Sequence, residues 1–445
     1  MRLRIRALVA LVAMSLVAAG CGARFPRTAA NSSGESVAAT ETGDTTPGAD
    51  TGAAGEATTE TTLAGAVTTL AGGLTKSTAA GGADIGPTTG VTATTIKIGY
   101  LLPLTGAAPV PSNFDKGANV YWNYINQKGG INGRQIQVVI KDTKSSAQVG
   151  KDQAKALVEQ DKVFAVVVLD RLENQQAIGE YLDARKVPNI EIQTPANLKQ
   201  SQTWTFGVTI DHGVQGALIA DYFVKVLGVK KAAIVYEGTP ALAPGRDAFT
   251  KEMGKLGGTV SYSKSIDGQE NDFSQEALGL SKSGAGAAWL YMAPTPAAKL
   301  VNQAQAAGYH PTWFANSISW NFDLVFTVAP TALRGARAFS PWLPLSDPRT
   351  NTYKQAYRAQ TGQAPDDLGI VGWGVGTIVG AGLRGAGKQL GQNGFRIAMQ
   401  SLKFKPDIWA PLSFGPNVRE GANVVAVLKE QGGQWALDRD FTASF

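Results

Sequence analysis

The chain is poor in the residues that form cross-links and metal sites. It has one cysteine and two histidines among 445 residues, which excludes a disulfide framework, a Cys/His zinc site and an iron–sulfur cluster. We therefore expect no metal and no cofactor. Charge is also scarce, because 41 Lys and Arg against 35 Asp and Glu leave a net charge of only +6. This small, dispersed excess does not indicate a nucleic-acid partner.

The first 20 residues have the pattern of an export signal. Three arginines within residues 2–6 precede the uncharged run 7–19, which is too short to cross about 30 Å of hydrocarbon as a helix. Small residues follow, and then Cys21, the only cysteine. This order resembles a bacterial lipobox, in which the thiol is acylated. We predict a lipoprotein signal peptide at 1–20 and an extracytoplasmic chain anchored to the cell membrane by lipid at Cys21. The alternative is an ordinary signal peptide with a chance cysteine.

Residues 21–94 are dominated by Ala, Thr, Gly and Ser and contain few large apolar side chains. A segment of this composition, with no apolar period, does not bury enough surface to offset the entropy of ordering. We predict a disordered tether that holds a folded part away from the membrane. A Thr-rich glycosylated stalk is the alternative.

From residue 95 onward strand-like and helix-like segments alternate, which predicts an α/β fold with parallel sheets covered on both faces. Two blocks of such units indicate two lobes. The predicted strands are 95–102, 135–140, 164–169, 189–192, 232–236, 259–262, 287–292, 312–314, 335–339, 424–428 and 435–437. The predicted helices are 113–128, 146–160, 175–185, 213–227, 246–256, 273–282, 296–307, 347–360, 367–388 and 395–403.

One predicted helix has an unusual composition. The segment 368–383 has no charged residue and carries Gly372, Gly376 and Gly380 at a spacing of four. Such a row is typical of membrane helix dimers, but the segment is short for a bilayer span of roughly 20 residues. We expect instead a buried helix in tight contact with a sheet.

Two motifs near the start of this region resemble a known family. The pattern I-K-I-G-x-x-x-P-L-T-G at 96–106 and the pattern N-x-x-G-G-I-x-G at 126–133 are similar to the start of type I periplasmic binding proteins. They are most like the branched-chain amino-acid (Leu/Ile/Val) substrate-binding lipoproteins of ABC transporters. The resemblance implies two Rossmann-like lobes joined by a three-strand hinge, with ligand held in the cleft between them. It places lobe one at 95–208 plus 345–411, lobe two at 209–344 plus 412–445, and the crossings near 207–212, 338–345 and 411–417.

Ligands of open α/β sheets bind beyond the carboxyl ends of the strands, so the loops after the strands are the candidate site. These loops are 105–112, 170–174, 193–197, 237–245, 292–295 and 315–320. The candidate ligand-binding residues are Thr105, Leu172, Glu173, Asn174, Thr194, Ala196, Asn197, Asp211, Thr239, Thr295, Ser317 and Trp320. Plainer interpretations exist for Asp170 and Arg171, as a surface ion pair, and for Trp320, as a core tryptophan.

The candidate site departs from what the resemblance implies. Relatives that bind amino acids hold the α-carboxylate with a Ser/Thr-rich loop, where this chain has Arg171-Leu172-Glu173-Asn174. Relatives also place an acid near Ser317 to pair with the ligand ammonium, and residues 315–320 contain none. An unpaired, desolvated ammonium is costly. The acids that could take this role are Glu173, Asp211 and Glu237.

An enzymatic alternative rests on two short motifs. Ser261 and Lys264 match the S-x-x-K of serine penicillin-recognising enzymes, and Lys282-Ser283-Gly284 is similar to their K-T-G. The nucleophile of those enzymes opens a helix, whereas Ser261 lies in a predicted strand, and no S-D-N motif is present. We therefore expect no catalytic residue and no enzymatic activity.

The combined features predict a lipid-anchored solute-binding protein of an ABC importer. We expect it to bind a small amino-acid-like or related compound in the interlobe cleft and to deliver it to an ABC permease. We expect a monomer with no nucleic-acid partner. The alternative is a ligand-sensing lipoprotein that regulates a membrane partner without transport.

Overall fold

The structure, a computed structural model, describes residues 67–70, 74–77, 84–106, 113–194, 198, 202–317, 319–320 and 322–445. The predicted signal peptide, the lipidation site Cys21 and the candidate residues Ala196 and Asn197 lie outside this part of the chain. All described residues belong to one unit, 62–445. The range predicted as a tether contains two short strands that pair antiparallel, β1 (Val67–Leu70) and β2 (Leu74–Ser77).

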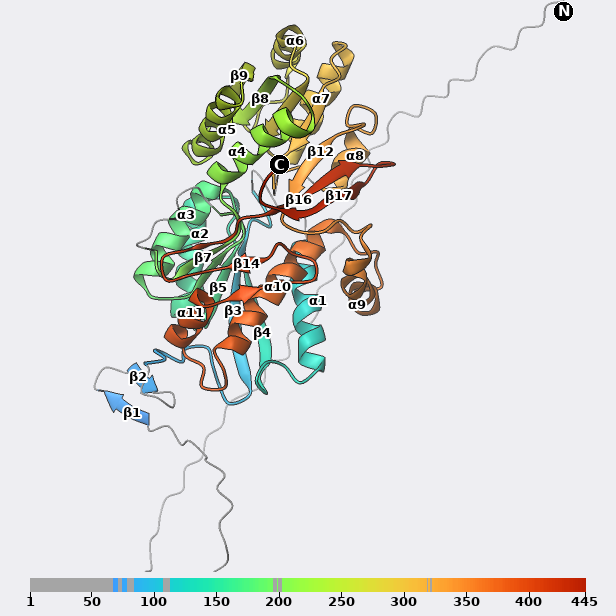
Figure 1. The fold of residues 1–445 in the computed structure, drawn as a ribbon. Coiled ribbons are helices and arrows are strands. Elements are labelled where there is room, and N and C mark those ends of the chain that lie inside the picture. The colour runs from blue at the N-terminus through green and yellow to red at the C-terminus, as the bar shows by residue number, and fades with distance from the viewer. Residues whose placement is uncertain are drawn as a thin grey trace, which may run out of the picture. The chain divides into compact units, whose positions relative to one another are not determined.

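One sheet has six strands, all paired in parallel, in the order β15-β7-β6-β5-β3-β4 (Figure 1). Its strands are β3 (Thr95–Leu102), β4 (Gln135–Asp142), β5 (Ala165–Val168), β6 (Asn189–Glu191), β7 (Thr205–Ile210) and β15 (Glu420–Ala422). With it go α1 (Asn113–Gln127), α2 (Ala147–Glu159), α3 (Leu172–Ala184), α9 (Asn351–Thr361), α10 (Asp367–Gly385), α11 (Gln392–Gln400) and the pair β13 (Lys403–Phe404) and β14 (Leu412–Ser413). We call these elements lobe one. Every residue of β5 is buried, as expected for a strand covered on both faces.

The other sheet has seven strands in the order β17-β16-β12-β11-β10-β8-β9, and only its β12–β16 and β16–β17 pairs are antiparallel. Its strands are β8 (Lys231–Glu237), β9 (Thr259–Ile266), β10 (Ala287–Tyr291), β11 (Thr312–Ala315), β12 (Arg337–Ser340), β16 (Val425–Glu430) and β17 (Trp435–Thr442). Its helices are α4 (His212–Asp221), which continues as a π-helical turn at Tyr222–Val226, α5 (Ala243–Lys255), α6 (Ser274–Ser283), α7 (Pro294–Ala306) and α8 (Leu324–Val328). We call these elements lobe two.

Alternate residues of β8 supply two separate cores on opposite faces of their sheet. Ala233 and Val235 pack in one cluster with residues of α6 and α7. Ala232 and Ile234 pack in another with residues of α4 and α5. Because successive side chains of a strand point to opposite faces, one apolar run contributes to both helix layers.

Among the described residues, the chain crosses between the lobes three times: between β7 and α4, after β12, and between β15 and β16. The first two crossings lie within the expected ranges. The third lies at 423–424, beyond the expected 411–417. Phe414 packs edge-on against Phe206 of β7, with ring centroids 5.4 Å apart, and this contact keeps the segment on lobe one. Residues 420–422 then pair with β7, so they belong to lobe one and not, as expected, to lobe two.

Residues 84–94, at the end of the predicted tether, are bonded to lobe one. The backbone N–H of Asn393 donates to the carbonyl of Ile85 at 2.9 Å, and the Ile85 side chain is buried. These bonds satisfy N–H groups at the start of α11, whose N-cap residue, Gly391, has no side chain to accept them. The folded part of the chain therefore includes residues that composition alone assigns to the tether.

Helix α10 is buried through close contact with α1, from which it is distant in sequence (Figure 1). A Cβ added at Gly372 would lie 2.1 Å from the carbonyl oxygen of Phe114, and one added at Gly117 would lie 1.8 Å from that of Gly369. In the described part of the chain, α10 alone is long and apolar enough to cross a membrane, yet 83% of that stretch is buried within the fold. The expectation of a buried helix agrees with this, but the close partner is a helix and not a sheet.

We expect Gly372→Ala to lower the free energy of unfolding by about 1–3 kcal/mol, because the new methyl group pushes the α1 and α10 backbones apart. Gly385→Ala, on the same helix, is the matched control. Its Cβ would have Ala398 as nearest neighbour at 3.7 Å, so we expect a gain of up to about 1 kcal/mol from helix propensity. Urea unfolding of both variants measures the difference, and equal stabilities would contradict the close packing.

Candidate ligand-binding cleft

A cavity of about 480 Å³ lies between the two lobes, where strands of both sheets end. Lobe one lines it with Arg171 after β5 and Gln193 after β6. Lobe two lines it with Glu237 at the end of β8, Met292 after β10 and Asn316 after β11. The volume is within the range of small-molecule sites, roughly 300–1,000 Å³. The cleft therefore lies where the loops after the strands were expected to meet.

The candidate residues fall into three groups. Those that line the cleft are Leu172, Glu173, Thr239 and Thr295. Those that lie away from it are Thr105, Asn174, Thr194, Asp211, Ser317 and Trp320. Those outside the described residues are Ala196 and Asn197. The role of each in ligand binding stays a prediction.

The three lobe-one candidates that lie away from the cleft have structural partners. The Thr105 hydroxyl donates to Asp142 at 2.5 Å, and the Asn174 amide donates to Asp170 at 2.9 Å. The Thr194 hydroxyl accepts an N–H from a threonine of β7 at 3.1 Å. These short polar side chains hold the ends of the strands together.

The three lobe-two candidates that lie away from the cleft are engaged in the same way. The Asp211 carboxylate caps the first turn of α4. The Ser317 N–H donates to the side-chain oxygen of Gln215 at 2.8 Å. The indole N–H of the fully buried Trp320 donates to the carbonyl of Leu290 at 2.9 Å. Trp320 therefore has the position of a core tryptophan.

Arg171 connects the two lobes across the cleft. Its Nε donates to Oε1 of Glu173 and its Nη2 to Oε2 of Glu237, both at 2.9 Å. The Glu237 side chain is only 9% exposed, and its other oxygen accepts the N–H of Ala293 at 2.9 Å. Asp170 is buried within lobe one, and burial raises its pKa. The interpretation of Asp170 and Arg171 as a surface ion pair is therefore wrong, because the guanidinium pairs with the two glutamates.

His212 and Tyr291 form a neutral part of the lobe-two wall. The tyrosine hydroxyl and Nδ1 of the histidine share a hydrogen bond, and the tyrosine ring stacks on Trp289 with centroids 4.4 Å apart. Burial lowers the pKa of His212 to about 4 and raises that of Tyr291 well above its usual value. Neither side chain carries a charge at neutral pH.

Apolar side chains and one further loop complete the cleft. The loop 268–271 lines it and follows a strand that the sequence pattern predicted only as far as residue 262. That strand continues to Ile266, although Ser263, Lys264 and Ser265 are all polar and exposed and give no apolar alternation that would have predicted it. The apolar lining residues come from both lobes and include Pro103, Leu169, Leu172, Leu242, Met292, Phe322, Leu324 and Leu368.

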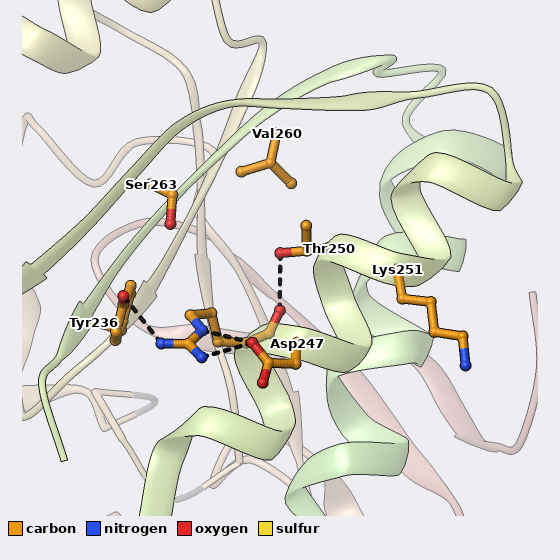
Figure 2. Close-up of a pocket in the computed structure, with 7 residues that line it drawn as sticks. Tyr236, Asp247, Thr250, Lys251, Val260 and Ser263 are labelled. Carbon is orange, nitrogen blue, oxygen red and sulfur yellow. Dashed lines mark hydrogen bonds and ion pairs between the residues drawn. The ribbon is translucent and has the colours of Figure 1, made fainter. Parts of the chain in front are cut away.

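A second hollow, of about 510 Å³, is lined by lobe two alone, at α5 and β9 (Figure 2). Arg246 donates from Nε to Asp247 at 2.8 Å and from Nη1 to the hydroxyl of Tyr236 at 3.2 Å. The Thr250 hydroxyl donates to the Arg246 carbonyl at 3.0 Å. Because these polar groups already satisfy one another and a single lobe supplies them, this hollow is the weaker candidate.

The enzyme motifs do not assemble into a catalytic pair. On β9, the Ser261 hydroxyl donates to the carbonyl of Ala232 at 3.3 Å, and Lys264 pairs with Glu276 at 3.5 Å. Residues three apart on a strand point to opposite faces, so the hydroxyl and the amine do not meet. Within the described ranges, no group of three or more His, Cys, Asp or Glu side chains is placed to hold a metal ion.

The chain belongs to the periplasmic binding protein family, whose sequence profile matches residues 95–434. An amino acid binding protein of Pseudomonas aeruginosa is 26% identical over 238 residues, which are 50% of this chain and 60% of that relative. The chain thus spans less than two thirds of that relative's length. Membership implies a place outside the cytoplasm, and the family consists of solute-binding proteins, not enzymes.

Solved structures share the fold. LivJ of Streptococcus pneumoniae, a branched-chain amino acid transporter substrate-binding protein in complex with isoleucine, is 20% identical with a TM-score of 0.69, covering 78% of this chain and 100% of that chain. A fatty acid ABC transporter substrate-binding protein from Thermomonospora curvata is 21% identical with a TM-score of 0.72, covering 80% and 94%. The α/β fold of two Rossmann-like lobes and the resemblance of the motifs to branched-chain amino-acid ABC binding proteins are thereby confirmed.

The buried His212 predicts a pH dependence of stability. Because burial lowers its folded pKa from 6.5 to about 4, the unfolded chain binds more protons between these pH values. The neutral, buried His212 therefore contributes fully to the free energy of unfolding above pH 6.5. As the pH falls toward 4 this contribution is lost, and the free energy of unfolding decreases by about 3 kcal/mol. We expect the stability advantage of the wild type over His212→Asn, from urea unfolding, to shrink by this amount between pH 7.5 and pH 4. His310→Asn, at an exposed position, is the control, and an advantage that does not change with pH would contradict the prediction.

Proposed function

We propose that the chain is the extracytoplasmic solute receptor of an ABC importer. It acts as a monomer, binds a small amino-acid-like or related compound in the interlobe cleft and delivers it to the permease. The observation that supports this most strongly is the cavity at the strand ends of both lobes, with Arg171 of one lobe bonded to Glu237 of the other.

Closure of two lobes on a solute explains how binding becomes a signal to a permease. In the part of the chain that the structure describes, three crossings join the lobes, so a small change of backbone angles there alters the gap between them. A solute that contacts both lobes stabilises the closed arrangement over the open one by the contacts made only when closed. The permease then needs to recognise only the closed arrangement.

The solute class we propose is a small carboxylate with an apolar body. Isoleucine, in the LivJ complex, and a fatty acid, in the name of the T. curvata protein, share a carboxylate and an apolar chain. Arg171 lies at a strand end of the lining, Lys299 of α7 is a second cation in it, and leucine, phenylalanine and proline side chains also line the cavity. Arginine presents a planar set of donors that suits a carboxylate.

We also propose that lipid at Cys21 anchors the receptor. Cys21 is the only thiol and directly follows the small residues of the export signal. The Ala-, Thr- and Gly-rich composition that follows supports a spacer between membrane and receptor. Several acyl chains on one cysteine give durable anchoring, whereas a single chain gives marginal binding.

Filling the cleft tests which hollow holds the solute. Thr295 lines the interlobe cleft and Thr250 lines the hollow on lobe two, and both are exposed. We expect Thr295→Trp to weaken binding on the order of a hundredfold by occupying the solute's space, and Thr250→Trp to leave it unchanged. The probe is whichever of isoleucine, octanoate and benzoate stabilises the wild type in thermal unfolding, which at a hundred times its Kd amounts to about 2.7 kcal/mol. Loss of binding in Thr250→Trp alone would contradict the assignment.

Cys21→Ser tests the anchor. We expect the wild type expressed in bacteria to incorporate an alkyne-labelled fatty acid and to sediment with membranes, because its acyl chains partition into the bilayer. The serine variant lacks the thiol and is expected to be unlabelled and absent from the membrane fraction. A wild-type chain that is unlabelled and soluble would contradict the proposal.

A further inference from the structure

Arg171 already occupies the cation position of the cleft. Glu237 is the most enclosed carboxylate on the lobe-two wall, at 9% side-chain exposure. One of its oxygens accepts the Ala293 N–H and the other accepts from Arg171, each at 2.9 Å. A carboxylate withdrawn from water in this way requires a cationic partner, and the chain supplies one from lobe one.

We propose that Arg171 takes the place that a ligand's amino group would otherwise fill, so that the cleft selects carboxylates without an amino group, such as alkyl and aryl carboxylates. This inference rests on the proposed function and narrows its solute class. It makes Arg171 a specificity-determining residue with two tasks, to neutralise Glu237 and to bind the solute's carboxylate.

The other acids that line the cleft are Asp170, Glu173 and Glu270, and none of them offers an ammonium a better place. Glu270, on the loop 268–271, is only partly buried, so water screens more of its charge than that of Glu237. Asp170 already accepts hydrogen bonds from Thr143, from Asn174 at 2.9 Å and from the Arg171 N–H at 2.7 Å. Glu173 pairs with the same guanidinium and is 41% exposed, so water screens much of its charge. An ammonium entering the cleft would have to displace Arg171 from Glu237 or share that carboxylate with a second cation. Such a juxtaposition of like charges is the usual means of rejecting a wrong ligand.

The same geometry leaves room for a carboxylate. A guanidinium has five N–H donors, and the bonds to Glu173 and Glu237 use two of Arg171's. Arg171 is also the N-cap residue of α3, a helix of 13 residues whose start has no side-chain cap. The positive end of that helix adds to the favourable potential for an anion. Leu172, Phe322 and Leu368 line the cavity nearby and suit an apolar body.

Matched pairs of solutes test this selectivity. Leucine and 4-methylpentanoate differ only in the amino group, as do phenylalanine and 3-phenylpropanoate. We expect the full-length chain, in calorimetry, to bind each deaminated acid on the order of tenfold or more tighter than its amino acid. Binding of leucine as tight as that of 4-methylpentanoate would overturn the inference while leaving the proposed receptor function intact.

Variants at Arg171 show whether this residue causes the selectivity. Arg171→Gln leaves Glu237 without its cation. We expect this variant to bind 4-methylpentanoate on the order of tenfold more weakly than the wild type, and its affinity for leucine relative to 4-methylpentanoate to rise. Arg171→Lys keeps the positive charge but loses the planar set of guanidinium donors. We therefore expect this variant to bind 4-methylpentanoate more weakly than the wild type and still to reject leucine. Lys251→Gln removes one charge from the exposed hollow on lobe two and is the matched control, with both affinities unchanged.

Two further outcomes would count against the inference. An unchanged affinity ratio in Arg171→Gln, with native unfolding behaviour, would show that Arg171 does not set the selectivity. Failure of both acid series and of the neutral 4-methylpentanamide to bind the wild type would contradict the proposed receptor function itself, and the inference with it.

Discussion

The ion pair between Arg171 and Glu237 depends on two sheets, one parallel and one mostly parallel, whose strands end at one cavity. Arg171 follows β5, which lies between β3 and β6, and Glu237 is the last residue of β8, which lies between β9 and β10. Both strands are hydrogen-bonded to a neighbour on each side, which favours high local stability, so each charge extends from an anchored part of its sheet. Removing Arg171 would leave the nearly buried carboxylate of Glu237 without a cation, whereas removing Glu237 would leave Arg171 paired with Glu173 alone, so the pair is a sensitive point of contact between the lobes.

Much of the fold could be predicted because parallel strands that are buried on both faces have continuous apolar sequences. The run at 164–169 became β5, and the run at 287–292 became β10. The third crossing was placed too early because it depends on the contact between Phe206 and Phe414, which lie far apart in sequence. The start of the folded part was placed too late because residues 85–87 bond to α11 and residues 90–94 bond to β3 and β4, which their own composition does not indicate.

The site was less predictable than the fold. Of the candidates predicted in the loops after strands, Thr194, Asn174 and Ser317 form hydrogen bonds within their own lobes and do not line the cleft, so their role in binding stays a prediction. Small polar residues at strand ends satisfy buried backbone groups as readily as they bind ligands, and only tertiary partners distinguish the two uses. Glu237, the partner of Arg171 on the other lobe, lies 66 residues away in sequence, so no local sequence pattern predicts this ion pair.

Proteins that share one fold bind different solutes, because the residues at the strand ends differ. Family membership therefore does not identify the solute, and the residues of the cleft have to be used instead. The most direct test is a crystal structure of the chain with a bound carboxylate such as 4-methylpentanoate. We expect the solute to lie between the lobes, to contact both of them and to have its carboxylate within hydrogen-bonding distance of Arg171. A solute bound in the hollow beside Arg246, or in contact with one lobe alone, would contradict it.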